Sequence, residues 1–306
     1  LEPGDEIITP SFTYIATTEV IALLRLKPVF VDVDPQTFCI DASKIRAAIT
    51  PKTKAIVPVH LYGQSCDMEE IMKIAQEHNL FVVEDNAQAI GATIRFSDGS
   101  VHKTGTIGHI GCTSFFPSKN LGCYGDGGSL MTNDDELANK MRMIANHGQE
   151  KKYHHKVLGC NSRLDTIQAT ILNIKLKHLD TYSQARNAMA LFYDTAFSAL
   201  AELQVPARQI NSTHVFHQYT LKVKNCKRNE LQKHLAEKGI PSMIYYPLPL
   251  YKQEAFQQFV PTDFKLVVSE DLCDEVLSLP IHTEMNIDSM NLVCNSVQSF
   301  FKKCIL

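Results

Sequence analysis

The chain has 306 residues and a formal net charge of −3, with 44 % hydrophobic and 21 % charged residues. This length and balance suffice for two packed domains and exclude an intrinsically disordered chain. The 30 basic residues form no long block and no apolar run reaches the ~18–20 residues of a membrane span, so neither a nucleic acid nor a membrane is an expected partner.

Short apolar runs alternate with segments of helical spacing in the first part of the chain. This alternation predicts βαβ units, and therefore a mainly parallel sheet covered by helices on both faces. The predicted strands are Ile7–Thr9, Pro28–Val33, Lys54–Val59 and Leu80–Glu84, and the predicted helices are Tyr14–Leu26, Asp41–Ile49 and Asp67–His78.

The pattern changes after about residue 180. Up to there we predict strands at Gly111–Phe116 and Gly128–Thr132, an irregular loop at Ile94–Thr106, and helices at Asp134–His147 and Arg163–Tyr182. A helix at Ser183–Leu200 precedes strands at Val215–Val223 and Ser242–Tyr245 and helices at Asn229–Lys238 and Asp288–Lys302. We therefore predict a large α/β domain over residues 1–180 and a smaller α+β domain over residues 181–306.

The nine cysteines form no C-x-x-C pair. Several lie in apolar surroundings, among them Cys112, Cys226 and Cys294. This usage predicts buried, reduced thiols in a cytoplasmic protein, with neither a disulfide framework nor a metal site.

Polar side chains follow three of the predicted strands. Asp85 and Gln88 come after Leu80–Glu84, His60 and Tyr62 after Lys54–Val59, and Lys119 after Gly111–Phe116. Ligands of open α/β sheets bind at the carboxyl ends of the strands. We therefore expect an acid, an amide, an aromatic ring and a lysine to meet at one edge of the sheet.

Lys119 and Asp85 form a chemically informative pair. A lysine after a buried strand has a lowered pKa and so offers a neutral amine to a carbonyl group, although a lone lysine is ordinarily a solvated surface residue. Asp85 could cap a helix or hold a heteroaromatic nitrogen protonated. Together the two residues match the needs of a pyridoxal phosphate (PLP) enzyme.

Five strings along the chain resemble the DegT/DnrJ/EryC1/StrS family of nucleotide-sugar aminotransferases. The strings are Pro10-Ser11-Phe12-Thr13-Tyr14, Glu84-Asp85-Asn86-Ala87-Gln88, Ser114-Phe115-Phe116-Pro117-Ser118-Lys119-Asn120-Leu121-Gly122, Gly125-Asp126-Gly127-Gly128 and Asn161-Ser162-Arg163-Leu164-Asp165. The resemblance spans essentially the whole chain. It implies the aspartate-aminotransferase-like fold (PLP-dependent fold type I) and PLP as cofactor.

The resemblance also implies roles for individual residues. Lys119 would join the cofactor covalently and move protons, Asp85 would pair with its ring nitrogen, and Gln88 would hydrogen-bond its phenolic oxygen. Tyr14 would stack on the ring, and Ser114 would bind the phosphate. The alternatives are a core aromatic for Tyr14 and a strand serine bonded to backbone for Ser114.

Asn161 and Arg163 extend the predicted site. Asn161 matches a residue that reaches the cofactor phosphate of a neighbouring subunit, which implies a homodimer with shared sites; it could equally cap the following helix. Arg163 could bind a uronate carboxylate through its guanidinium, or form an ion pair with Asp165.

Three features bear on the substrate. Asp126 before the paired glycines resembles the branch of the family that acts on 3-keto sugars, because members that use 4-keto sugars usually have glutamate there. His147-Gly148-Gln149, with Tyr153-His154-His155 and Asn161-Ser162-Arg163, resembles the branch that aminates UDP-2-acetamido-2-deoxy-3-oxo-glucuronate for O-antigen synthesis. Tyr245-Tyr246-Pro247 stands where relatives often have His-Tyr-Pro. We expect amino transfer from glutamate to this sugar, with Tyr245, Tyr246, His60 and Tyr62 as substrate contacts. A 4-keto or dTDP-linked 3-keto sugar, and a non-catalytic regulatory role, remain open alternatives.

The family's phosphate-binding turn lies upstream of the Pro-Gly-Asp-Glu string at residues 3–6. Such a turn uses the backbone amides at the start of a helix. We therefore expect a further segment to precede residue 1.

Overall fold

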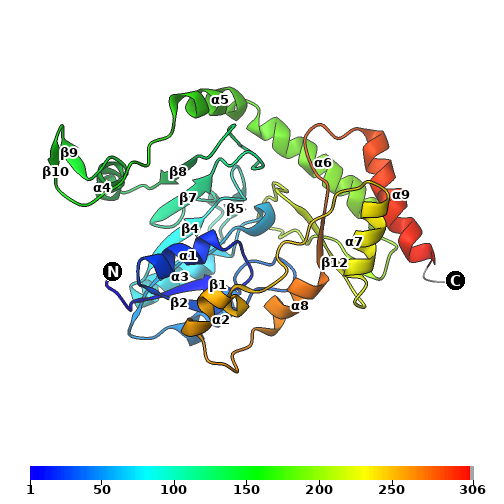
Figure 1. Cartoon of the computed structure of the whole chain (residues 1–306), viewed down its shortest axis with the longest axis horizontal. Helices are drawn as coiled ribbons and strands as arrows, with labels where there is room; N and C mark the ends of the chain where they lie inside the picture. Colours follow the sequence, from blue (N-terminus) through cyan, green and yellow to red (C-terminus); the bar gives the residue numbers. More distant parts are fainter. Residues whose placement is uncertain (304–306) are drawn as a thin grey trace.

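Six strands form the central sheet of the computed structural model, which describes residues 1–303 (Figure 1). The strands β2, β1, β3, β4 and β7 run parallel, and β8 closes the edge antiparallel to β7. This arrangement confirms the predicted mainly parallel sheet. In the order of the sheet, the strands are β2 (Lys27–Val31), β1 (Glu6–Pro10), β3 (Thr53–Ile56), β4 (Phe81–Asp85), β7 (Ile110–Ser114) and β8 (Gly128–Met131).

Side-chain caps fix the starts of three helices in the first half of the chain. Asp41, Asp67 and Asp134 each accept a hydrogen bond from a backbone N–H in the first turn of the helix that follows. These helices are α2 (Ala42–Ala48), α3 (Met68–His78) and α4 (Asp135–Ala145). Helix α1 (Ala16–Leu23) begins later than predicted, so Tyr14 lies in the loop before it.

A second, smaller sheet forms in the C-terminal part. Strand β12 (Tyr219–Val223) pairs antiparallel with β11 (Leu203–Gln204) and β13 (Val276–Leu279). Its core includes Tyr193, Leu231 and Phe301 from α6 (Leu179–Phe197), α7 (Arg228–Glu237) and α9 (Ile287–Lys303). Helix α5 (Thr166–Leu176) ends at Leu176 rather than at the predicted Tyr182.

Several predicted elements were wrong in detail. Residues 215–218 precede β12 as a loop, and Ser242–Tyr245 forms only an isolated bridge between Met243 and Ser278. The loop Ile94–Thr106 contains a hairpin of β5 (Thr93–Arg95) and β6 (Val101–Lys103). Short 3₁₀ helices occur at η1 (Leu61–Gly63), η2 (Leu250–Lys252) and η3 (Glu254–Phe259).

Helix α8 (Val267–Glu275), which the sequence pattern did not reveal, joins the two parts of the chain. Leu272 and Cys273 pack into the core of the parallel sheet. Asp32, at the end of β2, accepts hydrogen bonds from the amides of Val268 and Ser269 at 3.1 and 2.8 Å, and thus caps this distant helix. We still propose two domains with a boundary near residue 180, although α8 lies after this boundary and packs against the first domain.

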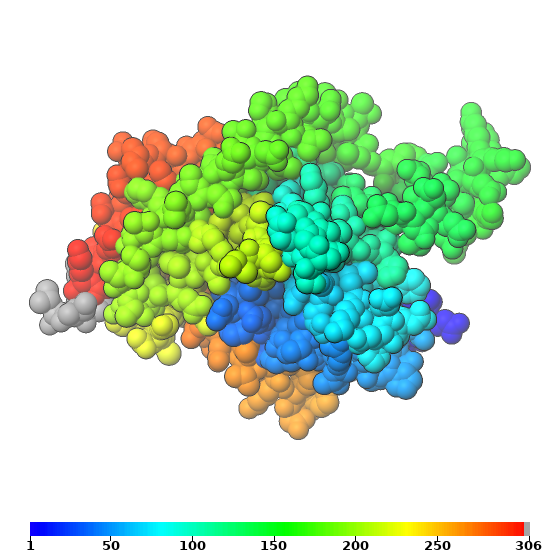
Figure 2. Space-filling view, turned by 180° about the vertical axis from the view of Figure 1, so that it is seen from behind, coloured from blue at the N-terminus to red at the C-terminus, as the bar shows by residue number. Residues whose placement is uncertain are grey.

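An arm projects from the body of the molecule. It consists of α4 and a small hairpin of β9 (Gln149–Lys151) and β10 (His154–His155), at the left of Figure 1 and the right of Figure 2. Residues 150–167 are exposed throughout, including Tyr153 and Leu158.

The cysteines partly follow the expectation. Cys39, Cys66, Cys123, Cys273 and Cys294 are buried and Cys112 is partly buried, but Cys160 and Cys226 are exposed. Cys226 lies in a turn after β12, with a positive φ of 57°. Among residues 1–303, no helix combines the length and apolar character needed to span a bilayer.

Candidate active site

A cavity of about 620 Å³ opens at the carboxyl ends of β4 and β7. Its walls include Asp85 and Gln88 after β4, Ser114 and Lys119 after β7, and Tyr246 from the C-terminal part. Its volume lies in the range of sites for small molecules. The sequence thus correctly placed an acid, an amide and a lysine at one edge of the sheet.

Lys119 stands in a tight turn after β7. Its backbone N–H donates to the carbonyl of Phe116 at 2.9 Å, and the chain doubles back so closely that a Cβ on Gly122 would come 2.5 Å from the carbonyl oxygen of Pro117. Only glycine fits there. Burial lowers the pKa of Lys119, against the opposing effect of the Asp85 charge. A larger fraction of this amine is therefore neutral and nucleophilic than in an exposed lysine.

The Asp85 carboxylate is oriented from both sides. Thr17 Oγ1 donates to one oxygen at 2.6 Å, and the amide of Ala87 donates to the other at 3.0 Å. Thr17 lies in the first turn of α1, so this helix positions the acid. The carboxylate also borders the cavity, where its charge can hold a proton on a basic ring nitrogen.

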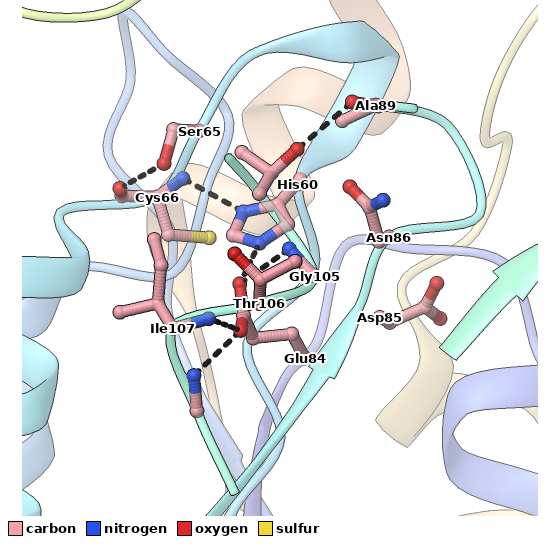
Figure 3. A network of polar contacts seen from close by, with 12 residues as sticks. His60, Ser65, Cys66, Glu84, Asp85, Asn86, Ala89, Gly105, Thr106 and Ile107 are labelled. Carbon is pink, nitrogen blue, oxygen red and sulfur yellow. Dashed lines mark hydrogen bonds and ion pairs between the residues drawn. The ribbon is translucent and has the colours of Figure 1, made fainter. Parts of the chain in front are cut away.

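The residue before Asp85 anchors the end of β4 from the other face. Figure 3 shows Glu84 and Asp85 pointing to opposite sides of the strand, as adjacent strand residues must. The fully buried Glu84 carboxylate accepts hydrogen bonds from the amides of Gly105, Ile107 and Gly108 at 2.6–2.7 Å.

His60 completes this buried network. Its Nε2 lies 2.9 Å from Glu84 Oε2, while its Nδ1 accepts from the amide of Cys66 at 3.1 Å (Figure 3). The ring therefore carries its proton on Nε2 and donates it to Glu84. Burial raises the pKa of Glu84, but the hydrogen bonds from His60, Gly108 and Gly105 outweigh burial and hold it below the ordinary value.

Comparison with known proteins identifies the fold and the chemistry. Residues 1–298 match the model of the DegT/DnrJ/EryC1/StrS aminotransferase family. The chain belongs to this family. Its members are PLP-dependent aminotransferases that act on sugars, and the chain is therefore a PLP-dependent sugar-nucleotide aminotransferase with fold type I.

Individual relatives differ in what their names describe. A pleiotropic regulatory protein of Geobacillus stearothermophilus is 48 % identical, covering 98 % of this chain and 79 % of the relative. The UDP-2-acetamido-2-deoxy-3-oxo-D-glucuronate aminotransferase of Pseudomonas aeruginosa is 44 % identical over 95 % of this chain and 78 % of its own length. Transaminases of dTDP-linked amino sugars are among the other relatives.

A solved structure supports the cofactor. The NtdA protein of Bacillus subtilis, determined with bound PMP, superposes with a TM-score of 0.89 at 32 % identity, covering 99 % of this chain and 69 % of that one. The donors around the cavity fit such a cofactor: an amine with a lowered pKa, a positioned carboxylate, and the hydroxyls of Ser114 and Thr13. Thr13 Oγ1 is buried without a hydrogen-bond partner in the described residues, as expected of a group awaiting a ligand.

Most of the predicted site residues border the cavity, and their individual roles stay predictions. They are Tyr14, Tyr62, Asp85, Gln88, Ser114, Lys119, Tyr245 and Tyr246. The structure contradicts the predicted substrate contact of His60, because its ring is fully buried and both nitrogens are engaged by Glu84 and Cys66.

Asn161 and Arg163 lie outside this cavity. Asn161 is exposed and forms a bridge with Asn146, while Asp165 occupies the N-cap position of α5 that we had considered for Asn161. Arg163 donates to Asn146 Oδ1 at 2.9 Å, and borders a neighbouring cavity of about 1050 Å³. The two cavities share Asp126 and Gly127.

Sequence reasoning missed Thr17 and His217. The Thr17 hydroxyl is recognisable only after folding brings α1 to β4. His217 lies in a stretch predicted as strand, yet it borders the cavity from the loop before β12, is 6 % exposed, and leaves Nδ1 unpartnered in the described residues. Burial and the nearby positive charges of Lys119 and Arg186 hold the pKa of His217 well below the ordinary value.

Proposed function

We propose that this aminotransferase moves the amino group of glutamate to the C3 keto group of UDP-2-acetamido-2-deoxy-3-oxo-glucuronate, for synthesis of a cell-surface polysaccharide such as O-antigen. We place this activity in the cytoplasm, where its free thiols stay reduced. The observation that carries the choice of sugar is the position of Arg163. Arg163 borders a cavity that shares Asp126 and Gly127 with the cavity of Lys119, and a guanidinium there can bind a uronate carboxylate.

The chain's own residues divide the chemistry among them. PLP, when bound, supplies the electron sink that stabilises negative charge on the reacting carbon. Lys119 would hold the cofactor and carry the proton at Nζ. Asp85, fixed by Thr17 and Ala87, would keep the cofactor's ring nitrogen protonated. Gln88 would donate to the ring oxygen, Tyr14 would cover the ring face, and Ser114 would bind the phosphate.

Amino transfer to a panel of UDP- and dTDP-linked keto sugars, followed by mass spectrometry, tests this function. We expect the 3-oxo-glucuronate to be the best acceptor. Replacing Arg163 with alanine should raise the KM for that uronate by about 10–100-fold, because a charge-assisted hydrogen bond is lost, while the KM for a neutral keto sugar changes little.

Arg142 provides a matched control for Arg163. It borders the same neighbouring cavity, so Arg142→Ala removes a similar charge at a different place. This variant should affect the uronate and the neutral sugar equally. Equal losses for both sugars in Arg163→Ala would instead contradict the carboxylate contact.

We further propose a homodimer in which Asn161 of one copy reaches the cofactor phosphate of the other. Support comes from the exposed stretch 150–167, which includes Asn161, and from the absence of Asn161 among the residues that border the cavity of its own chain. Mixing inactive Lys119→Ala protein with Asn161→Ala protein should then restore activity, because one site of each mixed dimer has both native residues. Absence of recovery after verified subunit exchange would contradict shared sites.

One relative is named a pleiotropic regulatory protein, so a purely regulatory role is the alternative function to test. A protein that only regulates does not need the catalytic pair, yet this chain retains both Lys119 and Asp85 at the cavity. Adding glutamate to the PLP-loaded protein distinguishes the two functions. An aminotransferase converts the visible cofactor band to the spectrum of PMP, whereas a purely regulatory protein leaves it unchanged.

A further inference from the structure

The buried side-chain amide of Gln88 is held at both ends. Its Oε1 accepts a hydrogen bond from the backbone N–H of Tyr62 at 2.7 Å. Its Nε2 donates to the hydroxyl of Tyr246 at 3.1 Å. The amide thus connects the loop after β3 with Tyr246, which lies 158 residues beyond Gln88 in the chain, and it does so at the wall of the active-site cavity.

The Tyr62 contact fixes which way the amide points. A backbone N–H can only donate, so it requires the oxygen of Gln88 and excludes the flipped orientation. Tyr62 holds this N–H in place with a left-handed backbone, φ 57°, which is unfavourable for a tyrosine. Its hydroxyl also donates to the carbonyl of Tyr245, and this ties the same loop to the residue beside Tyr246.

The Tyr246 hydroxyl fixes the other end. It accepts one N–H of the Gln88 amide, and this leaves the second N–H for a ligand in the cavity. The Tyr246 ring does not depend on this bond for its position. It packs against Phe12, Tyr14 and Tyr245, with ring centroids 6.1, 6.2 and 5.9 Å away.

We propose that Tyr246 is a positioning residue for the cofactor, acting through Gln88, in addition to any contact it makes with substrate. Its hydroxyl holds the amide so that the free N–H stays directed at the phenolic oxygen of the cofactor ring. The inference rests on the proposed role of Gln88. It makes the segment at residues 245–246 part of the cofactor site as well as of the sugar site.

The Tyr246→Phe variant of the PLP-loaded enzyme tests the proposal. It keeps the packed ring and removes only the hydroxyl. When the Gln88 donor is loosened, the negative charge on the ring oxygen is less stabilised. The pKa of the nitrogen that joins Lys119 to the cofactor should therefore rise. The pH midpoint of the visible cofactor band should rise by about half to one unit.

A double-mutant cycle shows whether Tyr246 acts through Gln88. Gln88→Ala alone should raise the midpoint at least as much as Tyr246→Phe. Adding Tyr246→Phe to Gln88→Ala should then produce no further shift. An unchanged midpoint in Tyr246→Phe, or an equal shift in both backgrounds, would overturn the proposal.

Kinetics of the two half-reactions give a second readout. A hydroxyl that serves the cofactor should slow the reaction with glutamate and the reaction with keto sugar by similar factors when it is lost. A hydroxyl that only binds sugar should affect the second reaction alone, which would overturn the proposal.

Tyr193→Phe is the matched control. The Tyr193 hydroxyl donates to the carbonyl of Pro280 at 3.0 Å in the C-terminal core, so its loss removes a comparable hydrogen bond away from the cavity. It should leave the midpoint unchanged. Failure of the proposed function itself looks different: the native protein would then transfer no amino group to the 3-oxo-glucuronate while its visible band persists, whereas a wrong role for Tyr246 leaves the band of the variant present and unshifted.

Discussion

Alanine at position 119 is expected to lower kcat by about 10⁴-fold or more and to abolish the visible band of covalently bound PLP. Both effects have one cause. In the proposed mechanism the Lys119 amine both holds the cofactor and carries the proton, so its removal takes away two functions at once. Absorption spectra and single-turnover rates with glutamate measure them separately.

The fold should survive this substitution. Burial disfavours the charged form of Lys119, and no hydrogen bond from its amine occurs within the described residues. Thermal unfolding should therefore change little. Lys73→Ala, which removes an exposed lysine, should keep both the band and the rate. A Lys119→Ala protein that retains the visible band would refute the assignment of this lysine.

The parallel sheet was predictable because its signal is local and strong. Buried parallel strands such as β2 and β4 are short apolar runs, and side-chain caps such as Asp41 and Asp67 mark helix starts within a few residues. Helix α8 was not predictable in this way. Its cap is Asp32, more than 230 residues earlier, and no local pattern at residues 264–268 reveals that partner.

The site shows the same division between local and long-range information. Lys119, Asp85 and Gln88 were found because each follows a strand within a few residues. His60 follows a strand in the same way, but its ring turns inward to Glu84, and only the folded neighbourhood of residues 105–108 explains why. A position just after a strand thus identifies candidate site residues. Whether such a side chain borders the cavity or turns into the core depends on the buried groups that it contacts after folding.

The hydrogen bonds of Glu84 hold the end of β4, the strand that leads to Asp85, in place. One carboxylate accepts from three backbone amides and from His60 in the protein interior. It ties the loop after β6 and the loop after β3 to the end of β4. Asp85 follows directly, and its carbonyl accepts from the amide of His60 at 3.0 Å. The position of Asp85 therefore depends on Glu84, a buried side chain that does not border the cavity.

Glu84→Gln is expected to reduce the free energy of unfolding by about 3–5 kcal/mol, because an NH₂ group then faces buried N–H donors that have no other acceptor. Denaturant titration measures this loss. The affinity for PLP should fall as well, since the end of β4 is no longer held. Glu77→Gln is a matched control: Glu77 pairs with Arg46 at 2.8 Å on the exposed surface, and its loss should have a much smaller effect.

The pH dependence of this loss provides a sharper test. The pKa of Glu84 lies below its ordinary value of 4.5, so the stabilisation by its carboxylate is fully present above that value and is lost as the pH falls through the lower, folded pKa. The difference in stability between native protein and Glu84→Gln should therefore be constant from pH 7 to about pH 5 and narrow below about pH 4.5. A difference that stays the same in acid would show that shape, rather than the charge of Glu84, holds the end of β4 in place.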